Sequence, residues 1–398
     1  SGGHMHIAHI VTRLLRAGSE ENTIETCRWQ AQAGHDVTLI HGPGHDHWWE
    51  ENLPPGVMRL VVPELVHPVH PFHDLLALRR LRAIYRDIQP DVIHTHQSKA
   101  GILGRLAASA APEAVVAHGI HIVPFEGVSR SKRAFYIAAE KLVARRTDVF
   151  IGVSEAVGRS YVAARIARRG RVHCVRSGMD LARFQGPEVP ADWRRLLGVP
   201  KGNRRPRVAL MMAAFEPRKR HVDFLQAFAK VAHTLPDLKL LLAGRGPEEE
   251  RVRAAVTRLG LDDQVVFCGH RSDPEALFAL ADLSILTSQR EGLPRVVVQS
   301  IAAGCPALVQ DLPGIDEVLD HSRNGWITRQ GDMAGTVRQM RALLADSRLL
   351  QRLREGALAT DVSAWSLQDF GPRTTALYGL PVRQPLPQLT GAPAWATA

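Results

Sequence analysis

The chain has 398 residues, which is more than one ordinary hydrophobic core organises, so two domains of about 150–200 residues are expected. Hydrophobic residues make up 45% of the chain and charged residues 23%, as in globular proteins generally, which excludes a disordered or fibrous protein. No apolar run approaches the roughly 18–20 residues that span a bilayer, and no signal peptide is recognised. The four scattered cysteines exclude a disulfide framework and a C-x-x-C zinc site. We therefore expect a cytoplasmic protein.

The net charge of +10 is concentrated in residues 129–176. This segment holds 12 lysines and arginines but only 3 acidic residues, so it carries a charge of +9 while the rest of the chain is nearly neutral. Such a patch indicates an anionic partner, either the lipid head groups of a membrane surface or a pyrophosphate-linked acceptor. A solvated, arginine-rich helix face is an equally good interpretation. Nucleic acid is not expected as a partner, because the basic residues are not interleaved with aromatic ones.

Strands and helices alternate through the first half of the chain. Ser1–His4 resembles a cloning remnant, so this domain is counted from Met5 and assigned to residues 5–185. Apolar runs and turn residues predict strands at 6–11, 36–40, 92–94, 114–117 and 149–153, and helices at 21–33, 75–86, 100–108 and 131–146. This order is typical of β-α-β units with a parallel sheet.

A segment rich in Pro and Gly, residues 186–206, is predicted to be a linker, after which the alternation begins again in residues 207–362. Strands are predicted at 207–212, 238–243, 265–267 and 283–287, and helices at 221–234 and 248–259. A last helix within 363–380 can pack back on either domain. The proline-rich tail, 381–398, is expected to be disordered. Two doubly wound α/β sheets in series imply a cleft between two Rossmann-like domains.

The segment from Glu291 to Gly304 carries the clearest chemical signal. It follows a predicted strand and opens a helix, so a carboxylate would stand beside backbone N–H groups of Leu293 and Arg295 at a helix start. Such a site can hold a diphosphate on its amides while Glu291 and Gln299 reach sugar hydroxyls. The equally weighted alternative is that Glu291 caps the helix and Gln299 is merely exposed.

Other polar features are weaker signals. The turn Ala243-Gly244-Arg245-Gly246 follows a predicted strand and allows close backbone approach to a ligand, but many α/β proteins contain such a turn without one. The pairs His45-x-His47 and His70-x-x-His73 fall in predicted loops with no carboxylate spaced to complete a metal site, so no metal is expected. His94 and His96 follow a strand, and a structural role is at least as probable for them as a functional one.

The ordered motifs of the chain resemble those of glycosyltransferase family 4, a group of retaining enzymes with the GT-B fold that includes capsule and O-antigen polysaccharide glycosyltransferases. Residues 291–299 resemble the family's E-x7-E motif. The resemblance extends over nearly all of residues 6–380, through matching segments at 94–108, 117–119, 153–156, 177–180, 269–273 and 324–325. The implied fold is α/β, with two Rossmann-like doubly wound domains facing a cleft.

The resemblance implies which residues act in catalysis and which residues of the first domain lie near the donor. Lys219 matches the lysine that neutralises the leaving diphosphate, and Glu291 matches the glutamate that hydrogen-bonds the transferred sugar. His118 matches a histidine near the hydroxyls of that sugar. Gly18 matches the glycine whose amide approaches the donor diphosphate.

The resemblance also assigns residues to donor binding in the second domain. Gln299 takes the place of the glutamate that grips the ribose, and Arg271 lies near the expected position of the base. Leu293, Pro294 and Arg295 line the phosphate loop with their backbone.

Two positions depart from the family pattern. The usual phosphate-binding arginine is replaced by Ala214, so we expect Arg218 or Arg220 to supply the missing charge. Gln299 stands where the second glutamate is usual, and its amide can still donate and accept hydrogen bonds.

The implied activity is transfer of a glycosyl unit from a nucleotide diphosphate sugar, with uridine preferred, to a glycan or lipid-linked acceptor with retention of configuration. The resemblance implies no metal or other cofactor. The alternatives are a GT-B nucleotide-sugar epimerase and a glycosyltransferase acting on a small natural product. A nicotinamide-dependent enzyme is disfavoured, because the turn after the first strand lacks G-x-G-x-x-G.

Overall fold

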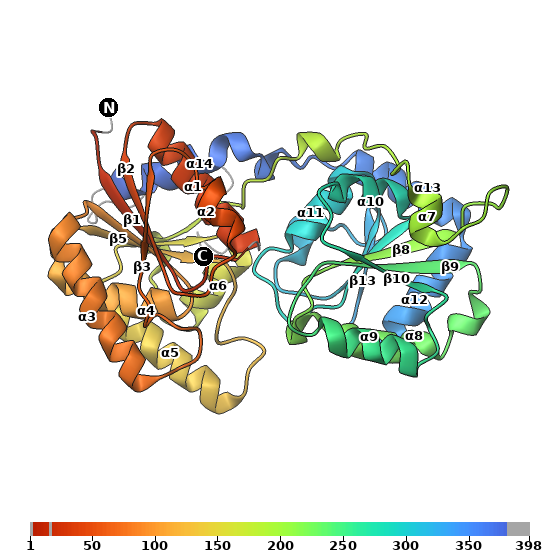
Figure 1. Cartoon of the computed structure of the whole chain (residues 1–398), viewed down its shortest axis with the longest axis horizontal. Coiled ribbons are helices and arrows are strands. Elements are labelled where there is room, and N and C mark those ends of the chain that lie inside the picture. The colour runs from red at the N-terminus through yellow and green to blue at the C-terminus, as the bar shows by residue number, and fades with distance from the viewer. Residues whose placement is uncertain (1–2, 16–17, 380–398) are drawn as a thin grey trace. The chain divides into compact units, whose positions relative to one another are not determined.

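The computed structural model describes residues 3–15 and 18–379, and the chain divides into two compact units. The first unit ends at Met179, and the C-terminal segment from Trp365 returns to it, so the second unit comprises Asp180–Ala364. Each unit contains one fully parallel sheet (Figure 1). The predicted disorder of residues 381–398 lies outside the described residues.

The sheet of the first unit has seven strands in the order β3-β2-β1-β4-β5-β6-β7. The strands are β1 (His6–Val11), β2 (Asp36–His41), β3 (Val57–Val61), β4 (Val92–His96), β5 (Val115–Ile120), β6 (Val149–Gly152) and β7 (Val172–Cys174). The helices are α1 (Gly18–Gln32), α2 (Trp48–Asn52), α3 (Pro71–Ile88), α4 (Lys99–Leu106), α5 (Arg130–Ala144), α6 (Glu155–Ala163) and α14 (Leu367–Ala376). All the predicted strands and helices of this domain are present, whereas β3, β7, α2 and α6 were not predicted.

The sheet of the second unit has six strands in the order β10-β9-β8-β11-β12-β13. The strands are β8 (Arg207–Met212), β9 (Leu238–Ala243), β10 (Val265–Gly269), β11 (Leu283–Leu286), β12 (Ala307–Gln310) and β13 (Gly325–Thr328). The helices are α7 (Trp193–Leu197), α8 (His221–Ala229), α9 (Glu249–Arg258), α10 (Pro274–Leu280), α11 (Arg295–Ala302), α12 (Met333–Ala345) and α13 (Ser347–Leu358). Helices α8, α9 and α12 share one apolar core with the sheet, and α7 and α10 share a second core on its other face (Figure 1).

The interpretation of residues 186–206 as a free linker is wrong. This segment belongs to the second unit and contains α7, whose Leu197 is 1% exposed in the core that also holds Phe184 and Phe278. The local proline and glycine content suggested a linker, but burial of this short amphipathic stretch ties it to the domain.

The last helix packs back on the first unit, which decides between the two alternatives for residues 363–380. Helix α14 lies against α1, and Gly371 faces Trp29 so closely that a Cβ atom there would lie 2.5 Å from the Cβ of Trp29. The side-chain amide of Gln30 on α1 donates to Thr375 Oγ1 at 3.2 Å and to Tyr378 Oη at 3.1 Å. Apolar packing and buried hydrogen bonds therefore both fix the C-terminal segment.

Candidate functional site

The strand order of the second sheet reverses between β8 and β11, which are direct neighbours. In open parallel sheets, ligands bind beyond the carboxyl ends of the strands at such a switch point. Residues 213–220 connect β8 to α8, and residues 287–294 connect β11 to α11. These two connections hold six of the residues that the sequence assigned to the site.

Lys219 and Glu291, one from each connection, form an ion pair in which the Lys219 ammonium donates to Glu291 Oε1. The same oxygen lies 3.1 Å from Nη1 of Arg218 and accepts a 2.8 Å hydrogen bond from Ser288 Oγ. Burial alone would raise the pKa of Glu291, but Coulomb attraction from Lys219 and Arg218 outweighs it and lowers this pKa to about 2. The carboxylate is therefore ionised at neutral pH and holds two cations together at the switch point.

Arg218, rather than Arg220, accompanies Lys219. Arg218 contacts Glu291 and also lies 3.1 Å from a carboxylate oxygen of Glu216. Arg220 instead donates to Gln330 Oε1 at 3.2 Å. Of the two candidates to replace the arginine expected at Ala214, the structure thus places Arg218 in the cluster.

The helix after Glu291, α11, starts at Arg295. Its N-cap residue is Pro294, so the alternative in which Glu291 is the helix cap is wrong. Leu293 and Pro294 are buried in the connection, and Gln299 is half-buried on α11. The carboxylate of Glu291 therefore forms ion pairs with Lys219 and Arg218 and does not cap the helix.

Arg271 and the turn at Gly244, two further features singled out in the sequence, both make contacts within the second unit. The guanidinium of Arg271 binds Asp273 through Nε at 2.7 Å and Nη2 at 2.8 Å, and its Nη2 lies 3.4 Å from Asp192. The turn at Gly244 packs against residues 213–220, because a Cβ there would lie 2.4 Å from the carbonyl oxygen of Ala213. The glycine of this turn therefore serves close packing of two chain segments, with φ at +136°.

In the first unit the strand order reverses between β1 and β4. Gly18, the predicted diphosphate glycine, is the first residue of α1, which follows β1. This position at the switch point agrees with a ligand-binding role for the start of α1.

His118 lies inside the first unit. The residue is 0% exposed on β5, its Nδ1 is 2.8 Å from Thr95 Oγ1, and its Nε2 is 3.5 Å from Nη2 of Arg105. Arg105 is also fully buried and forms a 2.7 Å ion pair with Glu140. Burial, and next to it the positive charge of Arg105, lower the pKa of His118 well below its ordinary value. The geometry thus makes His118 part of a buried polar network.

His121 is a residue that the sequence analysis missed. It follows the end of β5, is half-buried, and its Nε2 lies 2.9 Å from Nδ1 of His96. The pattern His118-Gly-x-His121 contained the signal, because the second histidine falls just past the strand, at the edge of the sheet where ligands bind.

The surroundings of His45 and His47 differ from the sequence prediction. The statement that no carboxylate accompanies His45 and His47 is wrong, because Glu50 Oε1 lies 2.8 Å from His45 Nε2 and 3.2 Å from His47 Nδ1. The short helix α2 brings Glu50 back beside the pair, which spacing in the sequence did not reveal. His70 and His73 stack on each other with ring centroids 4.0 Å apart.

The fold is shared with solved glycosyltransferase structures. HepE from Anabaena in complex with UDP and glucose aligns over 94% of this chain and 99% of its own, with a TM-score of 0.75 and 20% identity. Sucrose-phosphate synthase from Thermosynechococcus elongatus aligns over 94% and 98%, with a TM-score of 0.77 and 18% identity. Together with the two parallel sheets, this likeness defines the GT-B class of fold.

Family models and a relative specify the family. Residues 17–178 match the model described as "Glycosyl transferase 4-like domain", and residues 198–359 match "Glycosyl transferases group 1". The glycosyltransferase-family protein EpsD of Bacillus subtilis (strain 168) is 28% identical over 334 residues, which cover 82% of this chain and 84% of that protein. The chain belongs to glycosyltransferase family 4 and is a glycosyltransferase. Among its described residues, no helix is both long and apolar enough to cross a membrane.

Proposed function

We propose that this enzyme transfers a glycosyl unit from a UDP-sugar to a hydroxyl of a lipid-linked or polysaccharide acceptor in cell-envelope glycan synthesis, with retention of configuration. The observation that carries the proposal is the cluster of Lys219, Arg218 and Glu291 at the switch point of the second sheet. Two cations next to one carboxylate suit a ligand that combines a diphosphate with sugar hydroxyls.

In the proposed reaction the bond between the anomeric carbon and the diphosphate oxygen breaks, and the acceptor oxygen bonds to the same face of that carbon. The acceptor hydroxyl gives its proton to the departing diphosphate. Lys219 and Arg218 stabilise the negative charge that develops on the diphosphate, with the N–H groups at the start of α11 assisting. Glu291 exchanges its cations for the sugar hydroxyls when the donor binds. No divalent metal is needed for these steps, because side chains and helix dipole supply the positive charge.

The nucleotide and acceptor are proposed from the relatives. An Escherichia coli relative, 24% identical over 82% of this chain and 84% of its own length, is named UDP-Gal:alpha-D-GlcNAc-diphosphoundecaprenol alpha-1,3-galactosyltransferase. Its name describes a UDP-sugar donor and a lipid diphosphate acceptor, and the HepE structures contain UDP. We assign the donor to the second unit, with Gln299 at the ribose and Arg271 near the base, and the acceptor to the first.

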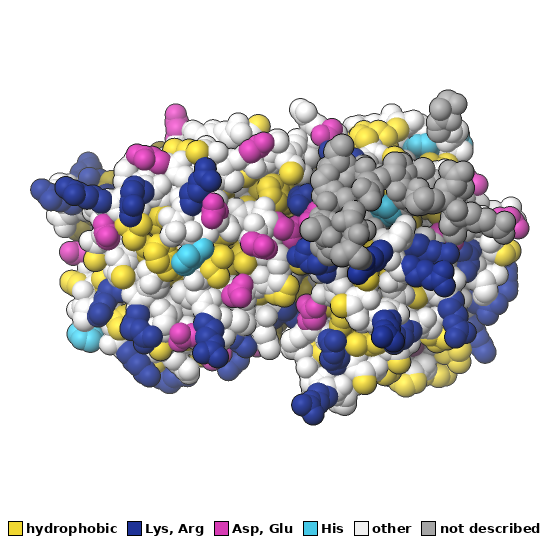
Figure 2. Space-filling model, turned by 180° about the vertical axis from the view of Figure 1, so that it is seen from behind, with side chains coloured by type: hydrophobic (Ala, Val, Ile, Leu, Met, Phe, Trp, Pro, Cys, Tyr) yellow, Lys and Arg dark blue, Asp and Glu magenta, His cyan; other side chains and the backbone are white. Residues whose placement is uncertain are grey.

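We further propose that the enzyme works on the cytoplasmic face of an anionic membrane, which it contacts through α5. Phe135 and Leu142 are 60% and 59% exposed, and the seven-residue spacing places them on one side of this helix. Lys132, Lys141 and Arg145 are exposed beside them. Figure 2 shows lysines and arginines interspersed with apolar side chains on the surface. This combination suits a lipid interface, where apolar side chains insert and cations meet head groups.

The test of the transferase proposal is turnover with a UDP-sugar and a polyprenyl-diphosphate-linked glycan. Lys219→Ala is expected to lower kcat by about 10²–10³, the loss typical of removing one charge-stabilising group. Lys230→Ala, at the exposed C-cap of α8, is the matched control and should retain full activity. Full activity in Lys219→Ala contradicts the proposed role of this residue.

Product analysis in the same assay separates the alternatives. Transfer with retained anomeric configuration at the new linkage supports the proposal, and inversion contradicts it. Conversion of the UDP-sugar to an epimer without acceptor identifies the epimerase alternative. Transfer to small hydroxylated natural products, but not to lipid-linked glycans, identifies the small-molecule alternative.

A further inference from the structure

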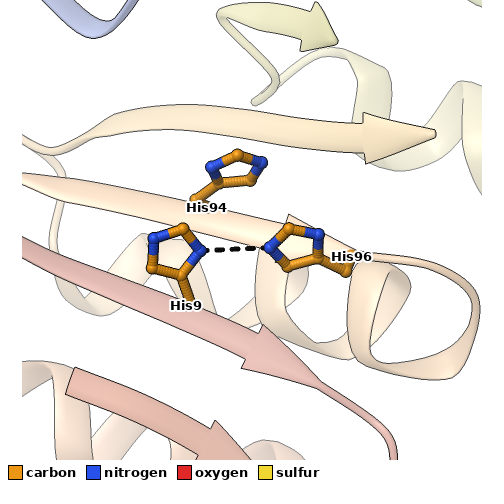
Figure 3. A group of neighbouring side chains, drawn as sticks. All are labelled: His9, His94 and His96. Atoms are coloured by element: carbon orange, nitrogen blue, oxygen red, sulfur yellow. Dashed lines mark hydrogen bonds between the residues drawn. The ribbon is translucent and has the colours of Figure 1, made fainter. Parts of the chain in front are cut away.

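Three histidine side chains gather in the interior of the first unit. His9 lies on β1, and His94 and His96 lie on the neighbouring β4, with exposures of 0%, 2% and 5%. In the parallel register His9 pairs with His94, and the two-residue spacing puts His94 and His96 on the same face of the sheet. Figure 3 shows the three rings side by side above the two strands. One nitrogen of each ring lies within 4.8 Å of those of the other two.

The hydrogen bonds around His9 fix its tautomer. The hydroxyl of Thr375 donates to the carbonyl of Gly371 at 2.8 Å, so it accepts from the amide nitrogen of Gln30. The amide oxygen of Gln30 therefore faces His9, and His9 Nε2–H donates to it at 2.8 Å. This leaves Nδ1 of His9 with its lone pair directed towards Nε2 of His96, 3.1 Å away.

The other two rings are also held by one nitrogen each. Nδ1 of His94 hydrogen-bonds the hydroxyl of Tyr378, and Nδ1 of His96 lies 2.9 Å from Nε2 of His121. Each of the three imidazoles thus has one nitrogen engaged by an outer partner, and the inner nitrogens of His9 and His96 hydrogen-bond each other. Metal-ligating histidines have this arrangement, in which the outer hydrogen bond orients the ring and selects the ligating nitrogen.

A small cavity adjoins the rings of His94 and His96. It has a volume of about 20 Å³, and its lining includes His94, His96, Asn22 and Thr374. Asn22 Oδ1 and Thr374 Oγ1 are buried without a hydrogen-bond partner, in residues that are 3% and 2% exposed. Buried polar atoms rarely remain unpaired, and a cavity of this size accommodates about one water molecule. The cavity can therefore hold a further ligand, a water molecule, beside His94 and His96.

The ligand set suits zinc. Three imidazoles beside a cavity with room for a water molecule match the ligands that Zn²⁺ takes, at about 2.0–2.1 Å from each nitrogen.

We propose that His9, His94 and His96 form a binding site for one Zn²⁺ ion, with a water molecule from the adjoining cavity as fourth ligand. The hydrogen-bonded nitrogens of His9 and His96 are 3.1 Å apart, close to the distance of about 3.3–3.4 Å expected for two ligands of one tetrahedral ion. Binding of the ion would replace this hydrogen bond and require the three rings to turn towards the ion. The ion would link β1 to β4 and, through Gln30 and Tyr378, the C-terminal segment to the sheet. Its role is structural and separate from transfer at Lys219.

The test uses the full-length protein, purified without metal affinity and treated with chelator under mild denaturation before refolding. Zn²⁺ titration is expected to reach one ion per chain by elemental analysis and to raise the Tm by about 5–10 °C when Zn²⁺ is about 100 times its Kd. His96→Gln should lose both effects. The matched control, His45→Gln with His47→Gln, removes the surface histidines beside Glu50 and should retain both.

Anomalous scattering at the zinc edge, from crystals of the unsubstituted protein, locates the ion even if His96→Gln does not fold. An ion between His9, His94 and His96 supports the proposal. Zinc bound only in the group of His45, His47 and Glu50, or no bound zinc and no change of Tm, overturns it. In that case the buried histidines form a hydrogen-bonded network with water alone.

Discussion

At the scale of single residues, the ion pairs of Glu291 with Lys219 and Arg218 support the proposal that Arg218 compensates for Ala214. A diphosphate leaving group needs facing cations, and the position at which an arginine is usual carries none. Arg218 lies one residue before Lys219 and meets the same carboxylate oxygen at 3.1 Å, so the two side chains present adjacent positive charges. Ser288, which also donates to this oxygen, orients Glu291 between them.

Arg218 and Arg220 are therefore expected to differ in importance. Arg218→Ala should lower kcat by about 10²-fold, because it removes one of two cations facing the leaving group. Arg220→Ala should change kcat less than about threefold, since Arg220 contacts Gln330. Steady-state kinetics with the same donor and acceptor compares them. Equal losses, or a larger loss in Arg220→Ala, would show that Arg220 supplies the charge.

Glu291 gives a pH-dependent contribution to stability whose sign follows from its pKa. The pKa is lowered from 4.5 to about 2 in the folded chain, so the contribution is complete above about pH 4.5 and is lost as the pH falls towards 2. At neutral pH it is of the order of 3 kcal/mol, at about 1.4 kcal/mol for each pH unit. Glu291→Gln should reduce the urea midpoint at about pH 7, and its difference from the parent should shrink to less than half of that value near pH 3 and nearly vanish near pH 2. A difference that persists unchanged at the acidic pH would contradict the ion-pair explanation, and Glu250→Gln on the exposed side of α9 is a suitable control.

At the scale of elements, the basic residues of segment 129–176 are of two kinds. Some form hydrogen bonds within the first unit, and others are exposed and can meet an anionic partner. Nη1 of Arg133 donates to the carbonyl of Phe125 at 3.0 Å, and Nη2 of Arg146 donates to the carbonyl of Ala114 at 2.9 Å. These two arginines therefore stabilise loops of the first unit through hydrogen bonds to backbone carbonyls. Lys132, Lys141 and Arg145 are exposed on or next to α5, the helix that also carries the exposed Phe135 and Leu142.

Vesicle binding should therefore depend on the exposed cations of α5. Replacing Lys132, Lys141 and Arg145 by glutamine should weaken binding to vesicles with anionic lipid by about 10²-fold, since each basic residue near the surface contributes about 1 kcal/mol. Cosedimentation at low ionic strength measures this. The control replaces Arg338, Arg341 and Arg348, exposed on α12 and α13, and should bind like the parent. Equal binding by all three proteins would remove α5 as the contact.

The elements that the sequence predicted are those with strong local patterns. Strands such as β1 and β8 are continuous apolar runs bounded by turn residues, and both were predicted with the bounds observed. Strands β7, β12 and β13 have only three or four residues each, which is too short for a periodic pattern. Helix α7 was missed because the prolines and glycines around it dominate the local composition, whereas its burial depends on residues far away in sequence.

At the scale of the whole molecule, the sequence could assign residues to a site only where they belong to motifs that occur in a fixed order along the chain. It identified Lys219 and Glu291, which adjoin strand ends in neighbouring connections. It could not choose between Arg218 and Arg220, because the choice depends on side-chain direction after a turn. It also favoured His118, although β5 continues beyond this residue and leaves His121 at the edge of the sheet. The return of α14 to the first unit likewise depends on tertiary contacts with Trp29 and Gln30.

The positive charges of Lys219 and Arg218 predict how the rate of transfer from the donor responds to removal of divalent metal. In the proposed mechanism Lys219 and Arg218 balance the charge of the diphosphate, so transfer from a UDP-sugar should continue at its full rate with EDTA, and added Mg²⁺ should raise kcat less than twofold. A thermal-shift panel of UDP-, GDP-, ADP- and TDP-sugars under the same conditions should give the largest rise in Tm with UDP. Short EDTA treatment leaves a slowly exchanging buried Zn²⁺ ion in place, so the two metal questions remain separate. Loss of activity in EDTA that Mg²⁺ restores, but Zn²⁺ does not, would show that a divalent ion at the diphosphate, and not these side chains alone, balances its charge.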